Sequence, residues 1–194
     1  MLPSTTYCAS YFESDWDELR VPILPPDPDN PGQSLPFPVN TSEGQAEASG
    51  AEFSLTYLPS ERWLINFGLG LIDTNWLDLG DIDPSGNGIQ PGSPFAYAPE
   101  SSYSLGVTYD MPLSNGGHVM FVGQYGWQDE YVRDPAAQRT PVDANGNFIM
   151  EPSYGILNGR LVYEPAGADW TVALWGRNLT DEYYINGGFD TRFV

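Results

Sequence analysis

The residues that most often carry catalysis or bind transition metals are scarce in this sequence. Its 194 residues include one cysteine, Cys8, and one histidine, His118. A His/Cys metal site needs several such ligands and a disulfide needs two cysteines, so neither can form within the chain. A Ser–His–Asp site would depend on His118, which stands beside an expected Gly116–Gly117 turn and is expected to be interfacial or exposed to solvent. We therefore assign no catalytic residue and expect no cofactor.

Side-chain oxygens are abundant, so a calcium site is the one kind of metal site that the composition allows. Two segments carry oxygen-bearing residues at alternating positions: Asp78, Asp81, Asp83 and Asn87 in the first, and Asp143, Asn145 and Asn147 in the second. In the first segment, Pro84 and the lack of a distal glutamate break the calcium-loop pattern. The Asn–Gly of the second is a hairpin signal. Calcium binding is thus a hypothesis for both loops, and an ordinary Asp/Gly/Pro turn is the interpretation that we prefer.

The net charge excludes one large class of partners. With 26 acidic and 7 basic residues, the chain has a formal charge of −19. A nucleic acid is bound through basic side chains that neutralise its phosphates, and this chain would instead repel them. We expect no nucleic-acid partner.

The composition favours strands and turns over helices. Trp, Tyr and Phe make up 14% of the chain, and 21 glycines and 18 prolines interrupt it. The longest nearly apolar stretch, residues 63–72, is too short for a membrane helix of about 20 residues but close to the roughly 9–11 residues of a membrane strand. The first residues lack the basic and apolar regions of a secretory signal peptide. The sequence therefore predicts an all-β chain without a transmembrane helix.

Alternation of apolar and polar residues predicts seven strands. In the clearest case, 101–111, five apolar residues from Tyr103 to Met111 alternate with small or polar ones, so that one side of the strand is apolar and the other polar. The alternation is less regular at 62–76 and 153–164, where Leu64, Ile72, Ile156 and Val162 fall on the polar side. The expected strands are 5–20, 46–58, 62–76, 101–111, 118–133, 153–164 and 169–178.

The connections between these strands alternate in length. Short links occupy 59–61, 112–117 and 165–168, whereas long polar links occupy 21–45, 77–100 and 134–152. If consecutive strands are antiparallel neighbours, all the short turns lie at one end of the sheet and all the long loops at the other. This sidedness is typical of outer-membrane β-barrels, in which apolar side chains face lipid and polar ones line the lumen. We therefore predict an antiparallel meander that forms part of a transmembrane β-barrel.

Aromatic residues near the strand ends fit the interfacial girdles of such barrels. For any one of them, a place in an ordinary core is the alternative. The aromatic residues concerned are Tyr57, Trp63, Tyr163 and Trp170 beside the short turns, and Trp76 and Trp127 towards the opposite strand ends; beside the second short turn the apolar residue is Met111.

The segment WTVALWGRNLTDEYY, residues 170–184, resembles the end of the TonB-dependent receptor family. In that family a penultimate strand commonly closes with an aromatic–x–x–Asn–Leu–x–Asp–x–x–Tyr signature, which is fitted by Trp175, Asn178, Leu179, Asp181 and Tyr184. Segments 9–24, 45–76 and 101–132 resemble upstream strands and hairpins of the same family. Short polar side chains such as those of Asn178 and Asp181 stabilise turns, so we expect the motif to have a structural role.

The resemblance implies a bacterial outer-membrane location and the uptake of a scarce nutrient, such as a ferric siderophore, cobalamin or a glycan, with energy delivered through TonB. Intact members carry a signal peptide, a plug domain with a TonB-engaging segment and a barrel of about 22 strands. We expect residues 1–194 to be a C-terminal barrel segment without the plug, the TonB box and the signal peptide. The implied partners are outer-membrane lipid, the receptor's own plug, TonB and a small-molecule nutrient.

Seven polar residues are expected on the lumen side: Glu52, Asn66, Asp110, Gln124, Glu130, Asn158 and Arg177. They either contact a ligand or the plug, or belong to a hydrated interior without a specific partner.

Two other folds are open on the sequence alone. One is a soluble or surface β-sandwich that binds carbohydrate and holds calcium in its acidic loops. The other is a complete eight-stranded barrel with 185–194 as its closing strand, against which two glycines and weak alternation argue. The sandwich predicts that Leu105, Val107, Phe121 and Leu174 are sealed against a second sheet, whereas the barrel leaves them facing lipid.

Overall fold

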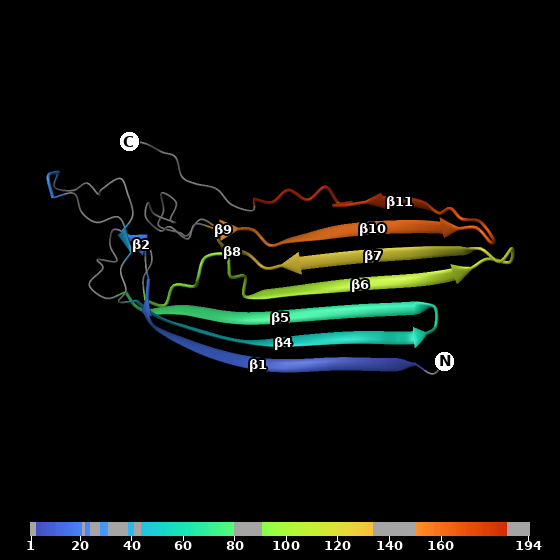
Figure 1. Cartoon of the computed structure of the whole chain (residues 1–194). Helices are drawn as coiled ribbons and strands as arrows, with labels where there is room; N and C mark the ends of the chain where they lie inside the picture. Colours follow the sequence, from blue (N-terminus) through green and yellow to red (C-terminus); the bar gives the residue numbers. More distant parts are fainter. Residues whose placement is uncertain are drawn as a thin grey trace.

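Seven long strands form one antiparallel sheet in the computed structural model (Figure 1). The structure describes residues 3–20, 22–23, 28–30, 39–40, 44–79, 91–133 and 150–185. The long strands are β1 (Ser4–Leu19), β4 (Gly44–Ser60), β5 (Trp63–Asp78), β6 (Ser101–Pro112), β7 (His118–Gln128), β10 (Tyr154–Glu164) and β11 (Val172–Gly176). Two short pairs accompany them: β2 (Pro22–Ile23) with β3 (Val39–Asn40), and β8 (Tyr131–Val132) with β9 (Met150–Glu151). Across the described ranges, no helix has the length and apolar character needed to cross a membrane.

The long strands follow one another in the sheet in the order β1-β4-β5-β6-β7-β10-β11, so each pairs with the next long strand along the chain. The short turns after β4, β6 and β10 lie at one end of the sheet, and the strand ends that lead into the long connections lie at the other (Figure 1). Two of the short turns contain a glycine with positive φ, 85° at Gly116 and 66° at Gly167. The predicted meander and its sidedness are confirmed.

Two strands are shorter than the alternation predicts. The expected strand 118–133 ends at Gln128, and just beyond this end the carboxylate of Asp129 accepts a hydrogen bond from the backbone N–H of Glu130 at 2.9 Å. The expected strand 169–178 narrows to Val172–Gly176. It ends before Asn178, whose φ of 48° lies in the left-handed region and is incompatible with a strand.

Register shows which side chains share a face, because residues opposite each other in neighbouring strands point the same way. Phe67 stands opposite Leu105 and Leu105 opposite Tyr125, on what we call the apolar face. Asn66, Gly106 and Gln124 occupy the neighbouring row on the other side, which we call the polar face. The four apolar residues expected on the polar side lie there, in register with polar-face residues; they are Leu64, Ile72, Ile156 and Val162.

The apolar face is not covered by a second layer. Leu105 is 39% exposed, Phe121 47% and Leu174 74%. The described residues form no second sheet on top of them, since the two short pairs contain only two residues per strand. This exposure contradicts the sandwich alternative, which needs these side chains in a closed core.

Strands β1, β4 and β5 have 16 or 17 residues, several more than the roughly 9–11 that cross a membrane. In the part of these strands that lies towards the long connections, the polar and apolar residues change sides of the sheet. Glu13, Ser49 and Asp73 form a polar row on the side that is apolar further along the strands. The opposite side carries Trp16, Ala46 and Trp76, of which Ala46 is fully buried.

The segment 91–100 packs on that opposite side and completes a small core. The ring of Phe95 lies 5.1 Å from the Trp76 ring and 6.0 Å from the Trp16 ring, centre to centre. Its backbone N–H donates to Thr74 Oγ1 at 2.9 Å. Trp76 therefore belongs to this inner cluster, and the prediction that it contributes to an outward aromatic girdle is wrong. Near Trp76 the apolar residues of the strand therefore shift from one side of the sheet to the other, and the sequence analysis did not predict this shift.

Candidate functional site

One row of the polar face holds three of the predicted lumen residues. Asn66, Gln124 and Asn158 fall in a single line across β5, β7 and β10, with Gly106 of β6 between the first two. Asn66 Oδ1 accepts a hydrogen bond from Thr56 Oγ1 at 2.9 Å. Asn158 Oδ1 accepts one from the backbone N–H of Asn178 at 3.0 Å. The register of the sheet thus brings amide side chains that are far apart in the sequence onto one surface.

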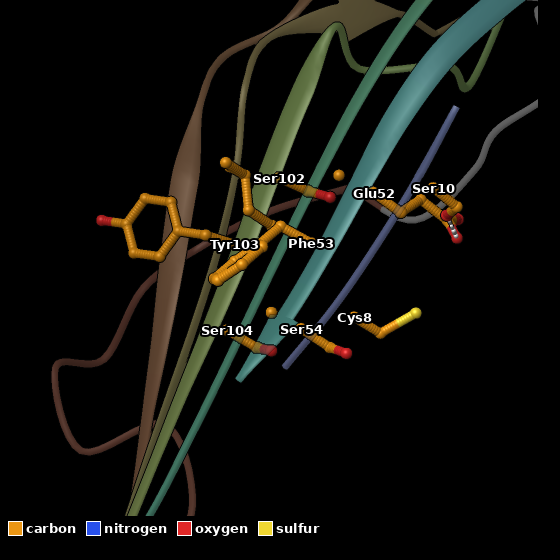
Figure 2. Close-up of a pocket in the computed structure, with 11 residues that line it drawn as sticks. Cys8, Ser10, Glu52, Phe53, Ser54, Ser102, Tyr103 and Ser104 are labelled. Carbon is orange, nitrogen blue, oxygen red and sulfur yellow. Dashed lines mark hydrogen bonds between the residues drawn. The ribbon is translucent and has the colours of Figure 1, made fainter. Parts of the chain in front are cut away.

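Glu52 lies in a hollow of about 400 Å³ on the same face (Figure 2). Ser10 Oγ donates to Glu52 Oε2 at 3.5 Å, and the free thiol of Cys8 lies beside them. The figure shows these groups on one side of the sheet, while the rings of Phe53 and Tyr103 point to the other. Glycines and serines make up most of the lining of this hollow.

Asp110 lies near the short-turn end, where its Oδ1 is 3.3 Å from His118 Nδ1. About half of the His118 side chain is exposed, as predicted for this residue. Glu130 lies two residues beyond the end of β7, in the link to β8, and is exposed there. It therefore stands outside the strand face on which the alternation placed it.

Arg177 lines a second and larger hollow of the polar face, with a volume of about 750 Å³. Its guanidinium carbon is 5.8 Å from the centre of the Trp175 ring. Arg160 of β10 stands opposite Trp175 in the register and lines the same hollow. The sequence reading did not single out Arg160, although its position two residues after Asn158 places it on the same side of the strand.

Asn178, Leu179 and Asp181 of the closing motif build a turn at the end of β11. Asn178 Nδ2 donates to the carbonyl oxygen of Glu182 at 2.8 Å, and Asn178 Oδ1 accepts from the Glu182 N–H at 2.9 Å. The N–H of Asp181 donates to the Asn178 carbonyl at 3.0 Å. Leu179 lies across the glycine pair Gly159 and Gly176, which leave room for it. These contacts give the motif residues a structural role.

Beyond this turn the chain is held by a buried carboxylate. Glu151 is 4% exposed; its Oε1 accepts a hydrogen bond from the Ile185 N–H at 2.8 Å, and its Oε2 is 3.3 Å from Arg133 Nη1. Tyr184 stacks on Tyr154 with ring centres 4.5 Å apart. Burial, followed by the negative charge of Glu151, raises the pKa of the Tyr131 hydroxyl above its ordinary value. Glu151 lies in a segment expected to be a loop, and its separation of 34 positions from Ile185 leaves no local signal for this contact.

The calcium hypothesis is only partly within the described residues. Asp78 is exposed at the end of β5. Asp81, Asp83 and Asn87 lie outside the described residues, as do Asp143, Asn145 and Asn147. In the described ranges, no group of three or more His, Cys, Asp or Glu residues has the geometry to hold a metal ion.

Comparison with known proteins decides between the folds that the sequence left open. The sequence pattern of the family described as TonB dependent receptor-like, beta-barrel, matches residues 7–179. The chain belongs to this family. The family consists of outer-membrane receptors and transporters rather than enzymes, and it places the chain in the bacterial outer membrane. The sheet is accordingly part of a transmembrane β-barrel.

Solved structures of TonB-dependent receptors share this fold. The ferric yersiniabactin uptake receptor FyuA from Yersinia pestis is 14% identical with a TM-score of 0.70, over 97% of this chain and 24% of that one. The siderophore receptor PiuA from Acinetobacter baumannii is 19% identical with a TM-score of 0.63, over 93% and 22%. The ferric preacinetobactin receptor BauA from Acinetobacter baumannii is 18% identical with a TM-score of 0.62, over 93% and 24%. The chain therefore spans about a quarter of the length of these receptors. No curated protein matches the chain by sequence.

The eight-stranded alternative depends on residues 185–194, of which only Ile185 lies within the described residues. The barrels that share the fold are about four times as long as this chain, which favours a segment of a larger wall.

Proposed function

We propose that this chain forms part of the wall of an outer-membrane receptor that imports a scarce nutrient with energy delivered through TonB. The observation that carries the proposal is the family match over residues 7–179, which runs from β1 to the closing turn. The sidedness of the meander and the exposed apolar face support it, because both are properties of a sheet that crosses the outer membrane. We propose no enzymatic activity for this chain.

The chain is proposed to supply seven neighbouring strands near the C-terminal end of the whole barrel. The closing turn of Asn178, Leu179 and Asp181 supports this place, because the motif resembles the one that ends the penultimate strand in the family. The plug and TonB would be partners of the whole receptor. The predicted lumen residues would line its water-filled interior, and Glu130 would lie near its outer mouth; the residues are Glu52, Asn66, Asp110, Gln124, Glu130, Asn158 and Arg177.

A ferric siderophore is the first nutrient to test. Of the nutrients considered, which also include cobalamin and glycans, it is the one named for similar structures, two of which are receptors for ferric preacinetobactin and ferric yersiniabactin. Their sequence identity to this chain is below 20%, so the likeness extends to the fold and not to a particular siderophore.

The test is uptake of radiolabelled iron by iron-starved cells in the presence of a panel of siderophores. We expect one siderophore whose uptake is lost when the gene is deleted, restored when the gene is returned, and lost again when TonB is removed. Uptake that is unchanged by deletion of the gene, for every siderophore as well as for cobalamin and oligosaccharides, would contradict the proposed function.

A further inference from the structure

Two guanidinium groups and an indole ring gather in the larger hollow of the polar face. Arg160 lies on β10 and Trp175 opposite it on β11, and Arg177 follows just after the end of β11. The amides of Gln124 and Asn158 complete the polar lining. The volume of about 750 Å³ falls within the roughly 300–1,000 Å³ that is usual for small-molecule sites. The hollow is therefore large enough for a ligand and offers it hydrogen-bond donors.

The charge of this hollow is opposite to that of the chain. The chain has 26 acidic and only 7 basic residues, and two of the seven lie here. Within the described residues, no aspartate or glutamate is part of the lining. Asp110, on the same face, is engaged with His118, and the buried Glu151 is engaged with Arg133. Two cations on a surface without a lining carboxylate create a local potential that favours a bound anion.

We propose that this hollow binds carboxylate groups of the small molecule that the receptor takes up, an inference that rests on the proposed function. A guanidinium group presents paired N–H donors that match the two oxygens of a carboxylate. Arg160 on β10 and Arg177 just after β11 hold the anionic groups, and Gln124 and Asn158 supply further donors. Trp175 packs against the apolar part of the ligand, and its place in the lining, 5.8 Å from the guanidinium carbon of Arg177, makes it an optical reporter of binding.

The experiment titrates the intact receptor, purified from outer membranes in detergent, with citrate, inorganic phosphate and uncharged sucrose. Calorimetry measures affinity, and the fluorescence change that disappears in Trp175→Phe reports binding at the hollow. We expect citrate to bind, and Arg160→Gln and Arg177→Gln each to weaken it about tenfold, the effect expected from losing a hydrogen-bonded ion pair. Arg62→Gln is the matched control, because it removes the same charge from an exposed turn residue and leaves citrate affinity unchanged.

Three results would overturn the inference: no binding of citrate, equal binding of citrate by the wild type and both hollow variants, or binding of phosphate but not of citrate. Binding of sucrose with the same affinity as citrate would also overturn it, because the site would then not select for charge.

The uptake assay separates this inference from the proposed function. Citrate binding in the hollow without TonB-dependent uptake of any nutrient would refute the function alone, whereas TonB-dependent uptake that is unaffected by both arginine substitutions would refute the hollow alone.

Discussion

Asn178 illustrates how a single side chain can end a membrane strand. Its amide both donates to and accepts from the backbone of Glu182, at 2.8 and 2.9 Å, while its backbone N–H donates to Asn158. Its φ of 48° is one that asparagine adopts more readily than other non-glycine residues. The side chain therefore satisfies two backbone groups that the sheet no longer pairs.

Asn178→Ala should destabilise the receptor by about 1–3 kcal/mol, because it leaves the backbone groups of Glu182 without their partner and keeps a strained φ. Urea unfolding followed by tryptophan fluorescence measures this loss. Asn178→Asp keeps the acceptor but not the donor, so its stability should lie between those of the wild type and the alanine variant. Equal stability of the alanine variant and the wild type would show that the turn does not depend on this amide.

Glu151 holds the segment after the turn, because the Ile185 N–H and Arg133 share its buried carboxylate. Replacing Glu151 by alanine leaves a part-buried guanidinium and a backbone N–H without their partner, which costs about 3 kcal/mol in comparable ion pairs. We expect hydrogen exchange of residues 178–185 to become roughly 100-fold faster, the ratio that corresponds to such a loss in local stability. Glu130→Ala removes a neighbouring exposed carboxylate and should leave this exchange rate unchanged.

Strand pairing depends on close approach at Gly50 of β4. A Cβ at this position would overlap the backbone carbonyl oxygen of Leu71 and the ring of Phe12. Because a carbonyl oxygen within a paired strand cannot move aside as a flexible side chain can, Gly50→Ala should destabilise the sheet by about 1–3 kcal/mol. Gly126→Ala is the control, since a Cβ there meets no atom within 4 Å. Comparable unfolding midpoints for the two variants would contradict this explanation.

A charge introduced on the apolar face of β6 should destabilise the receptor, whereas a charge on the polar face should have almost no effect on stability. Leu105 lies on the apolar face, so Leu105→Arg places a charge on the side of the strand that meets lipid. An arginine there, near the middle of the bilayer, costs about 2–4 kcal/mol of stability. Ser104 lies on the polar face, where water accommodates an arginine, so Ser104→Arg should change stability by less than about 0.5 kcal/mol. The measurement is the amount of heat-modifiable folded receptor in the outer membrane. A larger loss in Ser104→Arg than in Leu105→Arg would reverse the two faces.

The strands and their faces could be predicted because a period of two is a local property of the sequence. Tyr103, Leu105 and Val107 show it within a few residues, and register then extends it to Trp127 and Tyr125 of the next strand. The alternation fails where the environment changes along one strand. Beyond Leu71 the polar and apolar residues of β5 change sides, so Trp76 packs against Phe95, a residue from a connection that carries no periodic signal.

At the scale of the whole molecule, the family and the sidedness of the sheet were accessible from the sequence, whereas the larger hollow was only partly so. Asn158 and Arg177 were expected on the lumen side, but their convergence with Arg160 depends on the register between β10 and β11. Register is set by long-range pairing, which spacing along the chain does not encode directly. The same reason explains why the contact between Glu151 and Ile185 was not foreseen.

The most direct test of the central claim is accessibility along β6 in the membrane. Spin labels are attached one at a time to cysteines at positions 104–108 of the receptor after Cys8→Ser removes the native thiol, and relaxation by oxygen dissolved in the lipid is recorded. The fold predicts a period of two, with strong relaxation at Leu105 and Val107 and weak relaxation at Ser104, Gly106 and Thr108. Uniform relaxation along the strand, or the opposite phase, would contradict a sheet whose apolar face meets lipid.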